Sequence, residues 1–131
     1  MSATRAYNRS VELGTLSTLA AASAGATGTN VDLSQCKGIM LFINITAITG
    51  TTPTLTVTLK GIDPASGTAY TILTSAALNA TGLTVLRVYP GLTASANVAA
   101  TDVIPTTCRV DTAIAGTTPA VTATVSAIGI Y

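Results

Sequence analysis

Thr54-Leu55-Thr56-Val57-Thr58-Leu59-Lys60 alternates polar and apolar residues without a break. Successive side chains of a β-strand point to opposite faces, so this alternation predicts a strand that is buried on one side only. Leu55, Val57 and Leu59 are expected to face a core. Threonine suits the outer face because its branched Cβ favours an extended backbone.

The segment just upstream, residues 37–48, is apolar at nearly every position and predicts a central strand covered on both sides, with Phe42 in the core. Residues 49–53 (Thr-Gly-Thr-Thr-Pro) carry a turn signal, so we expect the two strands to form a hairpin. The stretch 46–53 recurs at 112–119, about half the chain later. Two interpretations stay open: an internal duplication, or two hairpins that use the same turn chemistry.

Turn signals divide the rest of the chain into further short strands. The turn at 63–67 opens with Asp63, whose side chain is expected to bind the turn backbone. Residues 14–29 and 91–104 are expected to be connections, with room for a helical turn at 16–22. Further strands are predicted at 11–13, 30–33, 68–75 and 83–89, with a last hairpin of 105–114 and 120–131.

Seven or eight strands with no convincing helix predict an all-β protein. We expect a single antiparallel β-sandwich or jelly-roll-like domain over residues 11–131, preceded by an extended N-terminal arm over residues 1–10.

The charge content narrows the possible functions. Charged residues make up 8% of the 131 residues, against about 25% in an average soluble domain. Disordered chains combine low hydrophobicity with high net charge, and this chain has neither, with 48% hydrophobic residues and a net charge of +1. The small net charge also argues against nucleic acid as a partner. No apolar run is long enough to span a membrane, and no apolar segment follows the first basic residues as in a signal peptide.

The reactive residues do not form a recognisable catalytic or metal-binding pattern. The chain has no histidine, and its five acidic residues form neither a close pair nor a calcium-binding motif. We therefore predict no catalytic residue, metal, cofactor or small-molecule substrate. Cys36 and Cys108 lack metal-type spacing and are expected to be free, buried thiols, or to form one bridge if their strands are neighbours.

Several stretches in combination resemble small structural proteins encoded by tailed bacteriophages. They are Val11-Glu12-Leu13-Gly14, residues 45–57, residues 86–92 (Leu-Arg-Val-Tyr-Pro-Gly-Leu), residues 102–105 and the final segment that ends in Tyr131. The resemblance covers residues 11–131. It implies a non-enzymatic head-decoration (cement) or minor virion protein that is made in the host cytoplasm and binds the major capsid protein on the outer surface of the capsid.

Strand edges rich in threonine and poor in charge are an aggregation hazard in a lone monomer, so we expect a symmetric oligomer. Capsid symmetry suggests a homotrimer. Arg5, Tyr7 and Arg9 of the arm and the adjacent Glu12 are the predicted partner contacts, because arginine and tyrosine are enriched at interfaces. The rival functions are a carbohydrate-binding or adhesin-type module and a self-assembling tail or tube protein.

Overall fold

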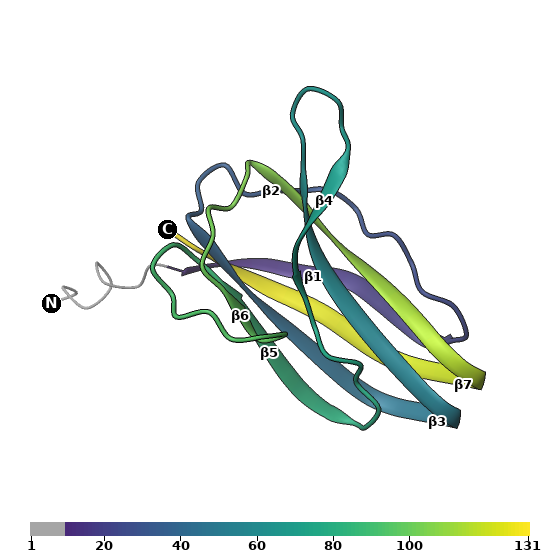
Figure 1. Ribbon diagram of the computed structural model, residues 1–131. Coiled ribbons are helices and arrows are strands. Elements are labelled where there is room, and N and C mark those ends of the chain that lie inside the picture. The colour runs from purple at the N-terminus through teal and green to yellow at the C-terminus, as the bar shows by residue number, and fades with distance from the viewer. Residues whose placement is uncertain (1–9) are drawn as a thin grey trace, which may run out of the picture.

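The computed structural model describes residues 10–131, and this part of the chain contains strands and no helix (Figure 1). The strands are β1 (Ser10–Ala22), β2 (Val31–Asp32), β3 (Gly38–Ile62), β4 (Ala69–Thr74), β5 (Gly82–Val88), β6 (Ala99–Ala100) and β7 (Thr107–Ile130). They form one open sheet in the order β1-β7-β3-β5-β6, with β2 beside β7 and β4 beside β3. All pairs are antiparallel except β5 with β6.

The all-β prediction is confirmed. The two separate sheets of a sandwich or jelly roll are not, because every strand belongs to the same hydrogen-bonded sheet.

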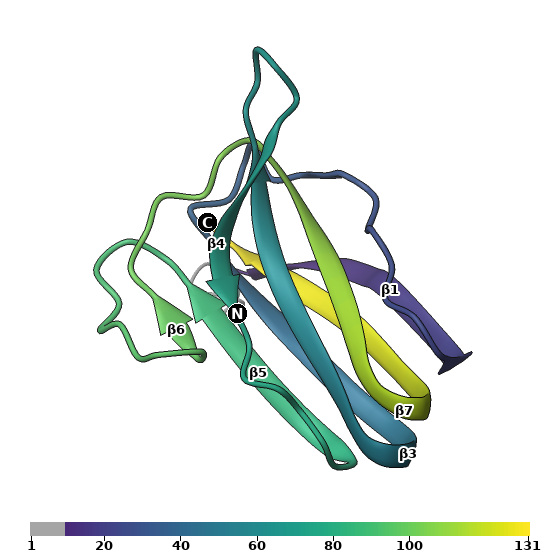
Figure 2. The same ribbon diagram turned by 45° about the vertical axis from the view of Figure 1, so that its right-hand side comes forward.

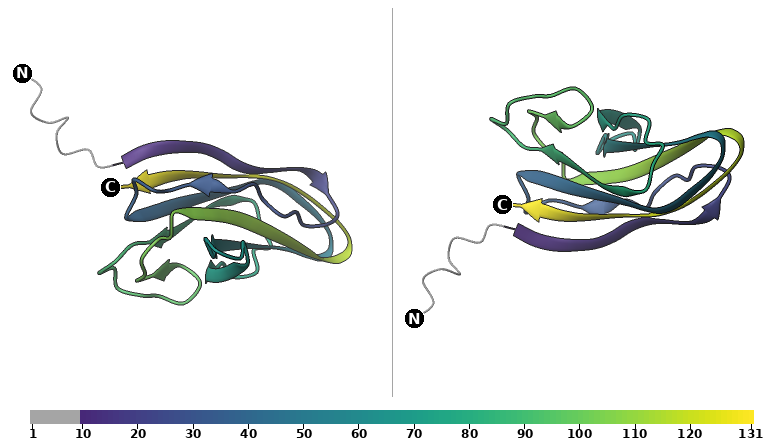
Figure 3. Two further views of the ribbon diagram at one scale, coloured as in Figure 1. Left: turned by 90° about the horizontal axis from the view of Figure 1, so that it is seen from above. Right: turned by 90° about the horizontal axis from the view of Figure 1, so that it is seen from below.

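Two long strands, β3 and β7, form the centre of the sheet. They pair from Gly38 with Ile130 at one end to Gly61 with Cys108 at the other. Both strands bend midway, and the two halves of the pair then lie over one another (Figure 3). The predicted hairpins of 37–48 with 54–60, and of 105–114 with 120–131, are therefore wrong. In each case the two segments are halves of one bent strand, and each half takes its hydrogen bonds from the other long strand.

The bend lies where the repeated sequence stretches meet, and Thr51 pairs with Thr117 at the corner (Figure 2). Gly50 has a φ of 123° and Gly116 a φ of 119°, while Thr52 and Thr118 have φ values of 47° and 46°. The hydroxyls of both threonines donate to the carbonyl of the preceding residue over 2.8 Å. The two stretches are thus near-identical halves of one corner, a local two-fold arrangement. The equivalent conformations require the same residue types at both stretches, and this holds under either interpretation of the repeat.

Bending the central pair encloses the hydrophobic core between its two halves. Leu55, Val57 and Leu59 are fully buried, as the alternation predicts. They join Ile43 and Val125 from the other half of the pair in one apolar cluster. Each Leu, Ile or Val side chain buried in this way contributes about 1.5–3 kcal/mol relative to its exposed state.

The first half of β3 is not covered on both sides. Ile39, Leu41 and Ile43 point into the core, but Met40 and Phe42 are only half-buried on the outer face. The expectation that Phe42 belongs to the core is therefore wrong. The alternation of burial along this half of β3 marks an outer face of the sheet that remains open to solvent.

The first strand is much longer than its predicted three residues. Residues 14–22 belong to β1, which pairs with β7 and places Leu19 in the core, so neither a loop nor a helical turn forms there. The pairing shifts register at three places, and Gly14 adopts a φ of 78°. Such bulges twist an edge strand and make it a poor template for pairing with another chain.

The remaining short elements follow the sequence more closely. The strands predicted at 30–33, 68–75 and 83–89 correspond to β2, β4 and β5. Asp63 binds its own turn as expected, since its carboxylate accepts hydrogen bonds from the Ala65 amide over 3.1 Å and the Ser66 hydroxyl over 2.6 Å. The connection 91–104 contains the two-residue β6, which was not predicted because the sequence there lacks any periodic pattern.

Candidate interaction surface

A polar groove lies on the outer side of the second half of the central pair. It has a volume of about 510 Å³, and it is lined by the loop that follows β1 and by residues of β3 and β7. The loop lies very close to β7: a Cβ on Gly25 would be 1.9 Å from the Thr112 carbonyl oxygen, and one on Gly28 would be 2.1 Å from that of Val110. Only glycine permits this approach. The two glycines therefore set the position of the groove wall.

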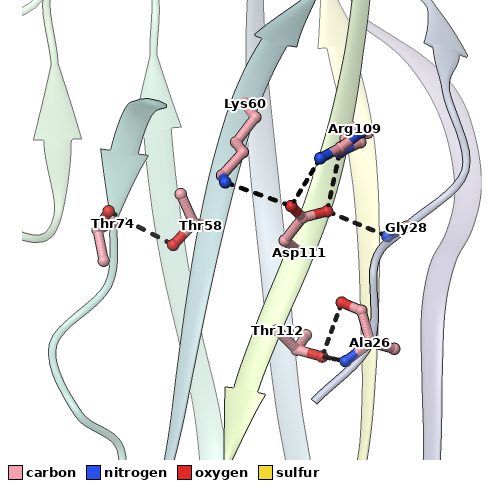
Figure 4. A network of polar contacts seen from close by, with 8 residues as sticks. All are labelled: Ala26, Gly28, Thr58, Lys60, Thr74, Arg109, Asp111 and Thr112. Atoms are coloured by element: carbon pink, nitrogen blue, oxygen red, sulfur yellow. Dashed lines mark hydrogen bonds and ion pairs between the residues drawn. The ribbon is translucent and has the colours of Figure 1, made fainter. Parts of the chain in front are cut away.

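Asp111 is the centre of a polar network beside this groove (Figure 4). Its carboxylate accepts hydrogen bonds from the Arg109 guanidinium over 3.0 and 3.2 Å and from the Gly28 amide over 3.1 Å. Lys60 Nζ lies 3.5 Å from the carboxylate. Burial alone would raise the pKa of Asp111. The hydrogen bonds from Gly28 and Arg109, together with the charges of Arg109 and Lys60, outweigh burial and lower the pKa below its usual 3.8.

A second contact ties the groove wall to β7. The Ala26 amide donates to Thr112 Oγ1 over 2.9 Å, and the Thr112 amide donates to the Ala26 carbonyl over 2.9 Å. On the other side of β3, the hydroxyls of Thr58 and Thr74 lie 3.4 Å apart. Because both cations of the network already bind one carboxylate, the surface offers mainly threonine hydroxyls and backbone groups. It can form hydrogen bonds with a partner.

The cysteines do not form a bridge. Cys108 is buried and Cys36 is half-buried, and both are free, which agrees with the expectation for the thiols except for the partial exposure of Cys36. Burial raises the pKa of Cys108 to about 12. Within residues 10–131, no cluster of three His, Cys, Asp or Glu side chains could hold a metal ion. The same residues include no helix long and apolar enough to cross a membrane.

An apolar surface covers the outer side of the first half of the sheet. Strand pairing places Glu12, Ile128, Met40 and Arg87 in one row across β1, β7, β3 and β5. We call this side the apolar face and define it by the outward residues Glu12, Met40, Phe42, Leu83, Val85, Arg87, Ser126 and Ile128. The same registers place four exposed polar residues on this side: Thr15, Thr18, Asn44 and Thr124. Two hollows lie on it: one of about 410 Å³ beside Met40 and Arg87, the other of about 240 Å³ beside Glu12 and Phe42.

Of the predicted partner contacts, Arg5, Tyr7 and Arg9 lie outside the described residues. Glu12 lies on β1, is exposed, and borders the apolar face. Sequence reasoning missed Met40 and Arg87 as members of the same surface. The signal was present for Met40, because a strand with one buried face must present every second residue on the other.

We compared the chain with protein family models, with curated proteins and with solved structures, and none of the three comparisons found a match.

Proposed function

We propose that this protein is a non-enzymatic structural component of a bacteriophage virion. It binds the major capsid protein on the outer surface of the capsid and stabilises the shell as a symmetric oligomer. In this proposal the two halves of the bent sheet act as the two layers of a β-sandwich. The residue patterns that resemble small phage structural proteins support it, as does the surface chemistry of the described residues.

The observation that carries the proposal is the scarcity of free charge on the outer side of the second half of the sheet. On the second half, outward positions of β3 hold Thr54, Thr56 and Thr58, and the nearby charges are Lys60 and Arg109, which both pair with Asp111 and leave a net charge of +1. Most proteins cover such positions with lysine and glutamate, which favour contact with water. A hydrogen-bonding surface with little charge suits close contact with another protein, where unpaired charges would lose solvation.

The direct test is to look for the protein in purified virions. We expect mass spectrometry of particles from the phage that encodes this chain to find it in a fixed ratio to the major capsid protein. Electron cryomicroscopy should place it on the outer surface of the shell. Its absence from purified particles would overturn the proposal. Polymers of the purified protein would instead support a tail or tube protein, and binding on a glycan array would support a carbohydrate-binding module.

A matched pair of variants tests which surface is involved. Ala113 is exposed and lines the groove, whereas Ala80 is exposed in the turn before β5. Ala113→Glu introduces a charge into the groove, so it should reduce capsid binding at least about tenfold if the groove contacts the shell, because an unpaired charge is expensive to bury. Ala80→Glu should leave binding unchanged. Equal binding by the two variants would exclude the groove as the contact.

A further inference from the structure

Charged side chains in the described residues fall into two groups. Six are engaged within the chain: Asp32, Asp63 and Asp102 accept backbone amides of their own loops, and Lys60, Arg109 and Asp111 form the network beside the groove. The other three, Glu12, Lys37 and Arg87, form no ion pair within residues 10–131. All three border the hollows of the apolar face. The charges that form no contact of this kind among residues 10–131 are therefore gathered around one surface.

The apolar face spans four strands and is partly open to solvent. Leu83 is 62% exposed, and Met40, Phe42, Val85 and Ile128 are half-buried. The loops around β4 and β6 lie on the opposite side of the molecule from β1 (Figure 3). An exposed apolar surface bordered by polar residues is typical of a site of protein association.

The charges lie at opposite edges of this surface. Glu12 is on β1 at one edge, and Arg87 is on β5 at the other side, beside the two-residue β6, in the same row across the strands. The two middle positions of the row are Ile128 and Met40. Consider a second copy that faces this surface and is related to the first by a two-fold axis. The axis lies in the plane between the two sheets, runs parallel to the strands, and passes over the space between β7 and β3. The row of one copy then faces the same row of the other in reverse order.

We propose that a second copy of this chain packs on the apolar face around this two-fold axis. Glu12 of each copy then meets Arg87 of the other, and Ile128 meets Met40. One row further along the strands, Ser126 meets Phe42. The pairing is isologous, as in most dimeric proteins, so the Glu12–Arg87 salt bridge forms twice by symmetry.

The alternative face-to-face arrangement does not pair these charges. An axis in the same plane but perpendicular to the strands would place β1 over β1 and β5 over β5, and Glu12 and Arg87 would each lack an opposite charge. Packed sheets cross at about 30°, and residues of the outer strands lie about 7 Å from the axis. The crossing moves them apart by roughly 4 Å, a shift that the long side chains of glutamate and arginine can follow.

The proposed dimer rests on the apolar face alone and does not depend on capsid binding. A virion protein could exist without this dimer, and a protein with another function could form it, so the two proposals can fail separately. The homotrimer predicted from capsid symmetry is the competing assembly, and the oligomer mass decides between the two.

The experiment is a charge exchange in the full chain, followed by sedimentation equilibrium. Wild-type protein should sediment at twice the 13.0 kDa chain mass. Glu12→Arg and Arg87→Glu each place like charges opposite one another twice per dimer, so each should weaken the dimer by at least about tenfold. The double variant Glu12→Arg/Arg87→Glu restores both pairs and should regain most of the affinity. Asn30→Arg, on the exposed loop before β2, adds a charge away from the face and should have no effect.

Folding of each variant is checked independently by circular dichroism, and both charged residues are exposed, so their replacement should leave the fold intact. A wild-type monomer or trimer overturns the proposal. A double variant no stronger than either single variant also overturns it, because the two charges would then not face each other. Rescue by the double variant alone supports the proposed axis, since neither a loss of apolar contact nor a folding defect would be reversed by a second charge reversal.

Discussion

Replacing Gly50 or Gly116 by alanine should destabilise the protein strongly, and by nearly equal amounts. Both glycines stand at the bend of the central pair, with φ values of 123° and 119° that L side chains rarely adopt. A Cβ on Gly50 would lie 2.8 Å from the Thr118 carbonyl oxygen and 2.9 Å from Pro119 Cα. A Cβ on Gly116 would lie equally close to the matching atoms of Thr52 and Pro53.

The magnitude follows from two contributions. The unfavourable backbone conformation costs about 1–3 kcal/mol. The contact adds about 1–3 kcal/mol, because the atoms in the way belong to the backbone and cannot rotate aside. Alanine also restricts the unfolded chain, which returns about 0.4–1 kcal/mol. We expect a net loss of about 2–4 kcal/mol for either variant.

Gly67→Ala is the matched control. Gly67 also has a positive φ, of 75°, but a Cβ there would have no atom within 4 Å. This variant should lose only the conformational part, about 1–2 kcal/mol. Urea unfolding at one protein concentration, followed by far-ultraviolet circular dichroism, gives the three free energies of unfolding on one scale.

Two results would refute the reasoning. If Gly50→Ala costs no more than Gly67→Ala, the close approach of the two strands at the corner is not real. If Gly50→Ala and Gly116→Ala differ by more than about 1 kcal/mol, the two halves of the corner are not equivalent. The double variant should cost less than the sum of the two, since the same backbone shift at the corner can relieve both contacts.

Three further predictions concern the core, the polar network and the thiols. Ile43→Ala should cost about 2–5 kcal/mol in urea unfolding, whereas Phe42→Ala on the outer face should cost the isolated chain less, and equal losses would contradict the burial pattern. Asp111→Asn should cost about 1–3 kcal/mol at pH 7. The folded-state pKa of Asp111 is lowered, so its contribution to the free energy of unfolding is present above pH 3.8 and is lost as the pH falls through the folded-state value. The difference in stability between variant and wild type should therefore shrink toward pH 2. A constant difference would argue against the network. Cys108 should react with iodoacetamide only after unfolding and Cys36 should react sooner, as peptide mass spectrometry of native and urea-treated protein can show; fast native labelling of Cys108 would contradict its burial.

The local pattern of the chain was sufficient to predict some elements. The alternation at 54–60 identified the buried residues of the second half of β3, and the Asp-Pro-Ala-Ser-Gly sequence at 63–67 identified a turn. Both depend on interactions between residues close in sequence. The same holds for β4 and β5, which are short and bounded by clear turn signals.

The bend could not be told from a hairpin turn by sequence alone. Glycine with a positive φ, threonine and proline serve both, because each needs the same local backbone freedom. A bend and a hairpin turn differ in the strand that pairs with each flanking segment, and here that strand is far along the chain. The length of β1 could not be predicted either, because the strand has few large apolar residues. Its pairing with β7, rather than the β-propensity of its own residues, keeps it extended.

The candidate surfaces required the pairing register. Glu12 and Arg87 are distant in sequence, and only the alignment of four strands places them in one row. The Asp111 network likewise depends on the loop that brings the Gly28 amide to β7. The contact of Asp111 with Arg109 needs no register, because residues two apart on one strand lie on the same face.

Pairing of Gly38 with Ile130 has a consequence for how the chain acquires its structure. The central strands cannot align until residues 107–130 are available, because almost every hydrogen bond of β3 on that side comes from β7. During synthesis, the first half of β3 therefore remains unpaired on that side, with its core-facing residues Ile39, Leu41 and Ile43 unprotected. Sheets dominated by such distant contacts fold in about milliseconds to seconds, far more slowly than helical bundles. The interval before closure is when the nascent chain is most exposed to misassociation with its neighbours, and when a chaperone would have the most effect.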